Sequence, residues 1–260
     1  MTSLALDAWL AQANQIATDA SSVPLRYFKQ NLAVERKGDQ SPVTRADRET
    51  EQVIRDGLMR AFPDHGLLGE EFGTCGAARR FLWVVDPIDG TKSFISGNPL
   101  FSTLIALVDQ ERDATLLGSV TFPALAEQYS AIRGRGAFCG TARLRVRDGC
   151  PFNEAMVYVN EGDRILAAEG DLLARLNRSC GILRFSYDAY SYAMLASGQV
   201  DALIDYGLQP YDYLAVAPLV EQAGGVITDW QGQPLTLRSP GTVVAASSPA
   251  LHAALLALLS

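Results

Sequence analysis

Two aspartates follow a strongly apolar stretch in the first half of the chain. The residues at 82–85 (LWVV) predict a buried strand, and Pro87 predicts that it ends at Asp86-Pro87, because proline cannot donate a ladder hydrogen bond. Asp86 and Asp89 are three positions apart across this proline turn. Their carboxylates can therefore point at one spot beyond the carboxyl end of the strand, where open α/β sheets place ligands.

The residues after Asp89 have the composition of an anion site. Gly90 allows a ligand to approach the backbone closely. The N–H groups of Gly90, Thr91 and Lys92 would open a short helix, and helix N-termini attract phosphate. The stretch at 83–94 thus predicts a metal together with a phosphate. The alternative is an ordinary strand, an aspartate-capped turn and a helix start, since Asp and Gly are common turn residues.

Further acids lie at the ends of other predicted elements, namely Asp47, Glu70 and Asp212. Five carboxylates in one cleft would raise one another's pKa unless cations offset them. Oxygen ligands select hard cations, so we expect Mg²⁺ first and Mn²⁺ second. Two of these acids have a structural alternative, because Asp47 could form a capping box with Thr44 and Glu70 could be solvated.

Several other chemistries lack the residues that they need. His65 and His252 are the only histidines, and the four cysteines are scattered without a C-x-x-C pair, which argues against zinc and against histidine-based triads. There is no G-x-S-x-G elbow and no Walker loop. The glycine-rich segment at 133–140 has its third glycine one residue late for a nucleotide loop, so it predicts a hairpin.

Composition and charge narrow the class of protein. The chain has 260 residues, of which 48% are hydrophobic and 20% charged, enough for a sizeable core. We expect a single compact unit over 1–260, made of two intimate halves at about 1–140 and 141–260. The net charge of −7 argues against nucleic acid or an anionic membrane as the main partner. The start of the chain does not resemble a signal peptide, and reduced cysteines fit a cytoplasmic location.

The periodicity of apolar residues predicts a layered α/β architecture. The first half begins with a helix at 4–30, bent or divided at Pro24, and a helix at 46–61. The other elements predicted in this half are a short strand at 67–68 and strands at 101–109, 114–122 and 127–132. In the second half, strands at 156–159, 182–186 and 200–205 alternate with helices at 163–176, 189–197 and 212–223, and two final strands lie near 226 and 242. Pro218 should kink the 212–223 helix.

Four motifs in this order resemble the inositol monophosphatase family of Mg²⁺-dependent phosphatases. They are S-P-V-T-x-x-D at 41–47, G-E-E at 69–71, D-P-I-D-G-T at 86–91 and D-x-x-x-A-x-x-x-x-E-x-A-G-G at 212–225. The resemblance extends over roughly 35–247. It implies an α/β fold, the αβαβα sandwich of that family, which is commonly dimeric.

The resemblance also implies roles for individual residues. Glu70, Asp86 and the Ile88 carbonyl would hold a first metal ion, and Asp86, Asp89 and Asp212 a second, with a third held through Glu70 and water. Thr91, paired with Asp47, would orient and deprotonate the attacking water, with Glu70 assisting. The N–H groups of Gly90 and Thr91 would bind phosphate oxygens, and Lys37 would lie near the third metal and the substrate.

Finer details are most similar to the histidinol-phosphate phosphatase branch of that family. They are DPIDGTKSFISGNPLFSTLIAL at 86–107 and PYDYLAVAPLVEQAGGVITDWQG at 210–232, with Lys92, Ser93 and Tyr211 at positions where inositol monophosphatases usually differ. The expected reaction is hydrolysis of L-histidinol phosphate to L-histidinol and phosphate. The alternatives are inositol monophosphatase, 3′(2′),5′-bisphosphate nucleotidase, and a non-catalytic protein that binds a partner.

The substrate side of the pocket is expected at two strand ends, near Asp188 and Asp205. Their carboxylates could pair with the ammonium and imidazole groups of histidinol phosphate, whereas inositol offers only hydroxyls. Alternatively, Asp188 could N-cap the helix at 189–197. Arg184 could be an internal partner for a carboxylate, and Tyr190 and Tyr192 are expected in the core or at its rim.

Overall fold

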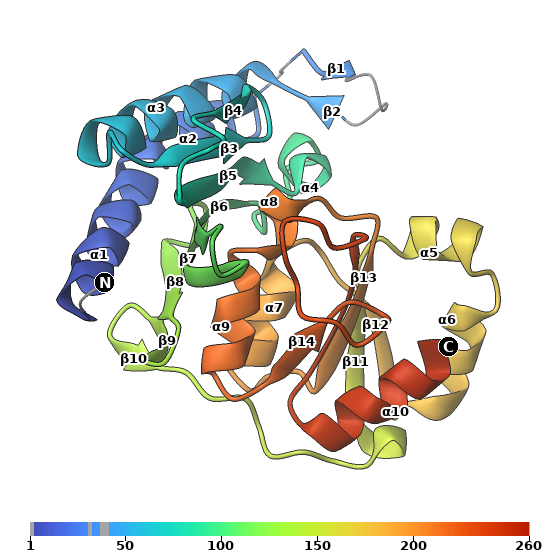
Figure 1. The fold of residues 1–260 in the computed structure, drawn as a ribbon. Helices are drawn as coiled ribbons and strands as arrows, with labels where there is room; N and C mark the ends of the chain where they lie inside the picture. The colour runs from blue at the N-terminus through green and yellow to red at the C-terminus, as the bar shows by residue number, and fades with distance from the viewer. Residues whose placement is uncertain (1–2, 31–32, 37–41, 260) are drawn as a thin grey trace.

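A computed structural model describes residues 3–30, 33–36 and 42–259, and shows five alternating layers of helices and sheets (Figure 1). The outer layer at the N-terminal side contains α1 (Ser3–Ala20), α2 (Ser22–Tyr27) and α3 (Arg45–Ala61). Apolar residues of α1 and α3, among them Ala13, Ile16, Ile54 and Leu58, pack against one face of the large sheet.

The large sheet has eight strands in the order β10-β9-β8-β7-β6-β5-β3-β4, and all neighbours are antiparallel except β3 and β5. Burial on both faces explains the long apolar runs of its central strands. The strands are β3 (Gly66–Gly69), β4 (Gly73–Cys75), β5 (Phe81–Asp89), β6 (Ser102–Asp109), β7 (Ala114–Phe122), β8 (Glu127–Ile132), β9 (Gly136–Cys139) and β10 (Ala142–Arg143). The hairpin predicted at 133–140 is confirmed, because β8 and β9 pair from Ile132 and Gly136 outward.

The middle layer lies between the two sheets and contains α7 (Tyr190–Ala196), α8 (Pro210–Tyr213) and α9 (Val216–Gln222). Their side chains join residues of both sheets in the largest apolar cluster. The approach of α9 to the large sheet depends on Gly118 of β7, because a Cβ there would lie 2.1 Å from the Ala215 carbonyl oxygen. Small residues at this contact therefore set the spacing between the halves.

The second sheet has the order β12-β11-β13-β15-β14 and is mixed, with β12, β11 and β13 parallel. Its strands are β11 (Met156–Val159), β12 (Ile182–Phe185), β13 (Ala202–Tyr206), β14 (Val226–Thr228) and β15 (Thr242–Ala246). The last layer consists of α5 (Gly162–Ala168), α6 (Leu172–Ser179) and α10 (Pro249–Leu259), which cover its outer face. Smaller elements are β1 (Glu35–Arg36), β2 (Pro42–Val43), the 3₁₀ turn η1 (Phe152–Glu154) and α4 (Thr91–Ile95).

The prediction of a layered αβαβα sandwich is therefore confirmed, but three helix predictions were too long. The N-terminal helix is divided at Ser21, three residues before Pro24. The helix expected at 163–176 is two helices, α5 and α6. The helix expected at 212–223 is likewise two, α8 and α9, so Pro218 lies in the first turn of α9, where proline is tolerated, and does not kink a longer helix.

The end of strand β5 was also predicted wrongly. β5 does not stop at Asp86-Pro87 but continues to Asp89, with its partners shifting from Leu104 opposite Asp86 to Ser102 opposite Asp89. Two residues of β5 bulge out between these pairs, which a strand tolerates at a proline. The bulge turns the backbone where the two aspartates lie.

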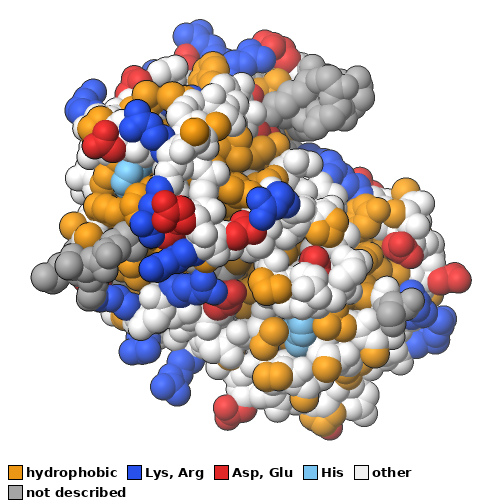
Figure 2. All heavy atoms as spheres, viewed as in Figure 1, with side chains coloured by type: hydrophobic (Ala, Val, Ile, Leu, Met, Phe, Trp, Pro, Cys, Tyr) orange, Lys and Arg blue, Asp and Glu red, His pale blue; other side chains and the backbone are white. Residues whose placement is uncertain are grey.

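Charges of both signs are interspersed on the face shown in Figure 2, among hydrophobic atoms. Charged side chains elsewhere in the structure form ion pairs, such as Arg80 with buried Asp109 at 2.8 Å and Lys92 with Glu161 at 2.8 Å. Among the described residues, no helix has both the length and the apolar character needed to cross a bilayer.

Candidate functional site

Three of the predicted acids meet where the two halves of the chain touch. Oxygen atoms of Asp86, Asp89 and Asp212 all lie within 4.8 Å of one another. The first two come from the bulged end of β5, and Asp212 comes from the first turn of α8. A separation of this size allows one hard cation to contact all three carboxylates.

The carboxylates of this cluster raise one another's pKa. Burial, followed by the charges of Glu70, Asp89 and Asp212, raises the pKa of Asp86 well above its usual value. Burial and the Glu70 charge raise the pKa of Asp212 to about 7. Carboxylates that repel one another in this way are suited to a divalent cation, and the all-oxygen donor set fits Mg²⁺.

Hydrogen bonds fix two of these carboxylates in orientation. The Ser102 hydroxyl and the Ala189 N–H both donate to Oδ2 of Asp89, each at 2.9 Å. The Gln209 N–H donates to Oδ2 of Asp212 at 2.7 Å in a capping box at the start of α8. Each aspartate therefore keeps its other oxygen for a ligand.

A hydroxyl and a buried acid lie beside this cluster. Thr91, the first residue of α4, donates its hydroxyl to Oδ1 of Asp47 or to the Ile88 carbonyl, both at 3.3 Å. Asp47 is fully buried, and burial raises its pKa. Its Oδ2 accepts from the backbone and hydroxyl of Thr44, so the capping box is present as well. The capping-box interpretation of Asp47 is confirmed, and its catalytic role stays a prediction.

The turn between β5 and α4 requires glycine. Gly90 has φ +78°, in the left-handed region, and caps α4. A Cβ at Gly90 would lie 2.5 Å from Cγ of Asp188, so this carboxylate packs directly against the turn. The predicted short helix after Gly90 is confirmed.

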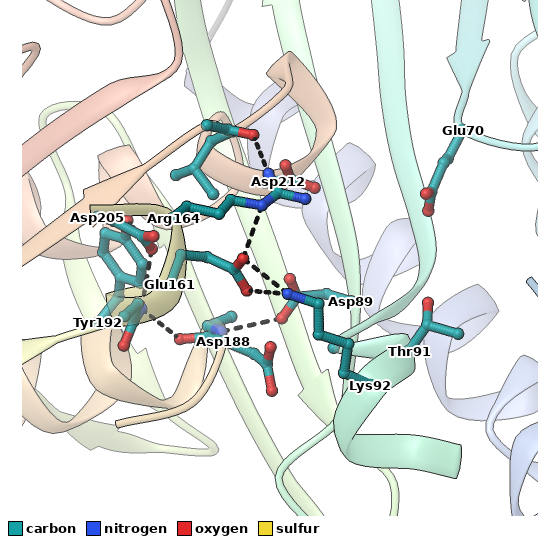
Figure 3. Close-up of a pocket in the computed structure, with 15 residues that line it drawn as sticks. Glu70, Asp89, Thr91, Lys92, Glu161, Arg164, Asp188, Tyr192, Asp205 and Asp212 are labelled. Atoms are coloured by element: carbon teal, nitrogen blue, oxygen red, sulfur yellow. Dashed lines mark hydrogen bonds and ion pairs between the residues drawn. The ribbon is translucent and has the colours of Figure 1, made fainter. Parts of the chain in front are cut away.

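A cavity of about 130 Å³ opens beside these residues (Figure 3). Glu70, Asp89, Thr91 and Asp212 face it, and Figure 3 shows their side chains directed into the same space. Its other walls contain Asp188, Asp205, Tyr192, Asn160, Glu161, Lys92 and Arg164. The cavity wall therefore combines candidate metal ligands with two further acids, Asp188 and Asp205.

Comparison with known proteins agrees with this geometry. The profile of the inositol monophosphatase family matches residues 5–260. The chain belongs to the inositol monophosphatase family. It is 37% identical over 238 residues to a histidinol-phosphatase of Chlorobaculum parvum, with 91% of each chain covered.

Two further matches come from inositol monophosphatases. The chain is 38% identical over 212 residues to an inositol-1-monophosphatase of Rhizobium meliloti, covering 78% of this chain and 77% of the relative. It matches the structure of an inositol monophosphatase from Zymomonas mobilis with a TM-score of 0.87 at 31% identity, over 100% and 99% of the two chains. As a member of the inositol monophosphatase family, the protein is a metal-dependent phosphomonoesterase.

The inositol monophosphatase fold places both predicted substrate residues in the cavity wall. Asp205 is buried and accepts hydrogen bonds from Asn160 at 2.8 Å and Tyr192 at 3.0 Å; burial raises its pKa to about 7. Asp188 accepts from the Ser93 hydroxyl at 2.5 Å, and burial raises its pKa to about 6. Asp188 does not N-cap the following helix, because its φ is +52° and its side chain turns to Ser93.

Other expectations on the substrate side had mixed outcomes. Tyr190 packs against Phe122 in the core, as predicted, whereas buried Tyr192 also lines the cavity. Arg184 is exposed on β12 and is absent from the cavity wall. Lys37 and Ser41 lie outside the described residues.

Sequence reasoning missed several polar side chains that line the cavity. Glu161 is held by Lys92 at 2.8 Å and by Arg164 at 2.9 Å, and Arg164 also donates to the Gly207 carbonyl at 2.8 Å. Asn160 directly follows β11, so the rule that places ligands at strand ends could have found it. The pairing of Glu161 with Lys92 joins residues 69 positions apart, for which one sequence gives no signal.

Proposed function

We propose that this enzyme hydrolyses L-histidinol phosphate to L-histidinol and phosphate with Mg²⁺. The observation that carries the proposal is the presence of two further acids in the cavity wall. Asp188 and Asp205 line the same cavity as Asp89 and Asp212 but do not belong to the three-aspartate cluster suited to the metal. Histidinol carries an ammonium group and a protonatable imidazole, and charge-assisted hydrogen bonds to carboxylates would hold both.

We assign metal binding to five residues. Glu70, Asp86 and the Ile88 carbonyl would hold one Mg²⁺, and Asp86, Asp89 and Asp212 another; a third ion remains a prediction. The Ile88 N–H donates to Oδ1 of Asp86 at 3.1 Å, which supports the turn of the backbone at this point. Bound Mg²⁺ would lower the pKa of a coordinated water and neutralise negative charge on the leaving group.

The proton is handled by two residues of this chain. The Thr91 hydroxyl lies 3.3 Å from Oδ1 of Asp47, and a threonine that donates to a carboxylate can accept a hydrogen bond from water at the same oxygen. Thr91 would thus orient the attacking water and pass its proton toward Asp47. Burial raises the pKa of Asp47, which makes its carboxylate a better proton acceptor. Glu70 would assist.

Phosphate would lie over the turn that Gly90 opens. The N–H groups of Gly90 and Thr91 would donate to phosphate oxygens. Lys37 would contribute to substrate binding from the segment outside the described residues. A homodimer and a cytoplasmic location stay predictions.

Inositol phosphate is the second candidate, supported by the identity of 38% to the Rhizobium meliloti inositol-1-monophosphatase. The two candidates differ in charge, because a polyol has no cation for Asp188 or Asp205. Phosphate release should therefore be measured with Mg²⁺ from L-histidinol phosphate, myo-inositol 1-phosphate and adenosine 3′,5′-bisphosphate. We expect kcat/KM for histidinol phosphate to exceed the others by about 100-fold, or about 2.7 kcal/mol of transition-state binding.

Variants of the two acids make the test specific. Asp188→Asn and Asp205→Asn should lower kcat/KM for histidinol phosphate about tenfold or more each, and change hydrolysis of glycerol 2-phosphate little, because that substrate carries no cation. Equal kcat/KM for all three substrates in the wild type would exclude the histidinol-phosphate assignment. The phosphomonoesterase activity would remain.

A further inference from the structure

We propose that Glu51 positions Glu70 by clamping the backbone of the loop that carries it. This inference rests on the proposed role of Glu70 as a metal ligand. Glu51 belongs to α3, on the outer layer of the fold, and is fully buried. A carboxylate with no solvent exposure needs hydrogen-bond donors around it, so its partners indicate what it does.

The partners of Glu51 are backbone groups next to Glu70. Oε2 accepts from the Glu71 N–H at 2.6 Å, and Oε1 accepts from the Phe72 N–H at 3.2 Å. The two donors belong to the first and second residues after Glu70. The two oxygens are thus used on the loop itself, and hydrogen bonds from backbone N–H groups to a carboxylate are among the stronger ones in proteins.

The residue before Glu70 is adapted to the same contact. A Cβ at Gly69 would lie 2.0 Å from Oε1 of Glu51, so only glycine lets the carboxylate approach this closely. On the other side, the Glu70 N–H donates to the Val85 carbonyl of β5 at 3.2 Å. The loop is therefore held between β5 and Glu51.

Arg55 completes the arrangement from the next turn of α3. Its Nη1 lies 3.1 Å from Oε1 of Glu51 and donates to the Gly73 carbonyl at 3.0 Å, which offsets the buried charge and ties the far end of the loop to the helix. Asp47 lies one helical turn before Glu51, on the same face. One face of α3 thus supports both Thr91, through Asp47, and the Glu70 loop.

A rigid loop has a specific benefit for metal binding. Groups that orient a ligand contribute to metal affinity, and their loss typically costs about 10- to 100-fold. Glu51→Gln keeps the shape of the side chain but replaces one acceptor by an NH₂ group that cannot accept from an N–H. We expect Mg²⁺ binding, measured by calorimetry without substrate, to weaken about tenfold in this variant.

The kinetic readout separates positioning from catalysis. The Mg²⁺ concentration for half-maximal rate should rise with the same factor in Glu51→Gln, while kcat at saturating Mg²⁺ should stay within about threefold of wild type. Glu49→Gln is the matched control, because Glu49 lies on the same helix and bonds to Tyr27 and Arg45 instead. It should leave Mg²⁺ binding unchanged.

A second variant tests the clamp with Glu51 in place. Gly69→Ala should push the Glu51 carboxylate off the loop and weaken Mg²⁺ binding by a similar factor. In a Glu51→Ala background, the alanine at position 69 meets no carboxylate, so Gly69→Ala should no longer weaken Mg²⁺ binding much further. Such non-additivity is expected for two groups in contact.

Three outcomes are distinguishable. Wild-type Mg²⁺ affinity in Glu51→Gln and Gly69→Ala, with a weakened Glu70→Gln, would overturn the clamp and leave the proposed function intact. Wild-type Mg²⁺ affinity in Glu70→Gln would remove Glu70 from the metal site and with it the basis of the proposal. A lower melting temperature of Glu51→Gln with unchanged Mg²⁺ affinity would reduce Glu51 to a structural role.

Discussion

Asp89→Asn should make the metal-free enzyme more stable while it abolishes turnover. The oxygens of Asp86, Asp89 and Asp212 lie within 4.8 Å of one another, and at that distance two full charges repel by about 3.5 kcal/mol at an effective dielectric constant of about 20. Burial, followed by the charges of neighbouring carboxylates, raises the pKa of Asp86 and Asp89, so protonation can relieve part of this repulsion. We therefore expect a net gain of about 1–2 kcal/mol.

The substitution preserves the local hydrogen bonds. The asparagine carbonyl oxygen can accept from the Ser102 hydroxyl and the Ala189 N–H, as Oδ2 of Asp89 does. Its NH₂ group then points toward Asp86 and Asp212, to which it can donate. For a protein of this length, the gain corresponds to a rise of about 2–8 °C in melting temperature.

Thermal unfolding in EDTA and in Mg²⁺, together with phosphate release, gives the measurement. The variant should melt higher than wild type in EDTA, gain less from added Mg²⁺, and release phosphate at a rate at least about 100-fold lower, since the ligand and its charge are lost. A lower melting temperature in EDTA would refute the repulsion argument. A near-normal rate would remove Asp89 from the metal site.

Four further predictions follow from the same geometry. Thr91→Val should lower kcat about 100-fold without changing Mg²⁺ affinity, whereas Thr91→Ser should keep most of the wild-type kcat. Phosphate release would measure kcat, and calorimetry would measure Mg²⁺ affinity. In EDTA, the free energy of unfolding should fall as pH rises from about 4 to 7, because Asp188, Asp205 and Asp212 bind protons more tightly in the folded state than in the unfolded state. Mg²⁺ should make this fall smaller, which thermal melts over a series of pH values would check. Gly90→Ala should cost about 1–2 kcal/mol in urea unfolding, because φ there is +78°. Calorimetry should show a single unfolding transition for residues 1–260.

Much of the site could be predicted because its residues follow predicted strand and helix ends. Asp86, Asp89 and Thr91 flank one apolar run, and Asp212 opens a helix, so local patterns alone place them at element ends. That these residues meet at one point depends on the order of the strands and layers in the fold. The sequence predicted that order only through the motifs that resemble the family. The fold class followed from the same alternation of strands and helices.

The errors arose where distant contacts decide local structure. Pro87 should stop a strand, yet β6 pairs on both sides of it and the bulge accommodates the missing donor. The N-cap alternative for Asp188 failed because contact with Ser93, 95 positions away, fixes its side chain. Glu51 gave no signal at all, since its partners are backbone N–H groups that any sequence provides.

The acid cluster also explains why the two halves should act as one unit. The first half supplies Asp86 and Asp89, but Asp212 and the N–H that orients Asp89 come from the second. Two more contacts cross at the same place, Lys92 with Glu161 and Ser93 with Asp188. Mutually repelling carboxylates stay together only if the packing around them is strong, and the apolar cluster shared by both sheets lies directly behind them. We infer that neither half forms the site alone, and that the energy of docking the halves is what holds the acids ready for the metal.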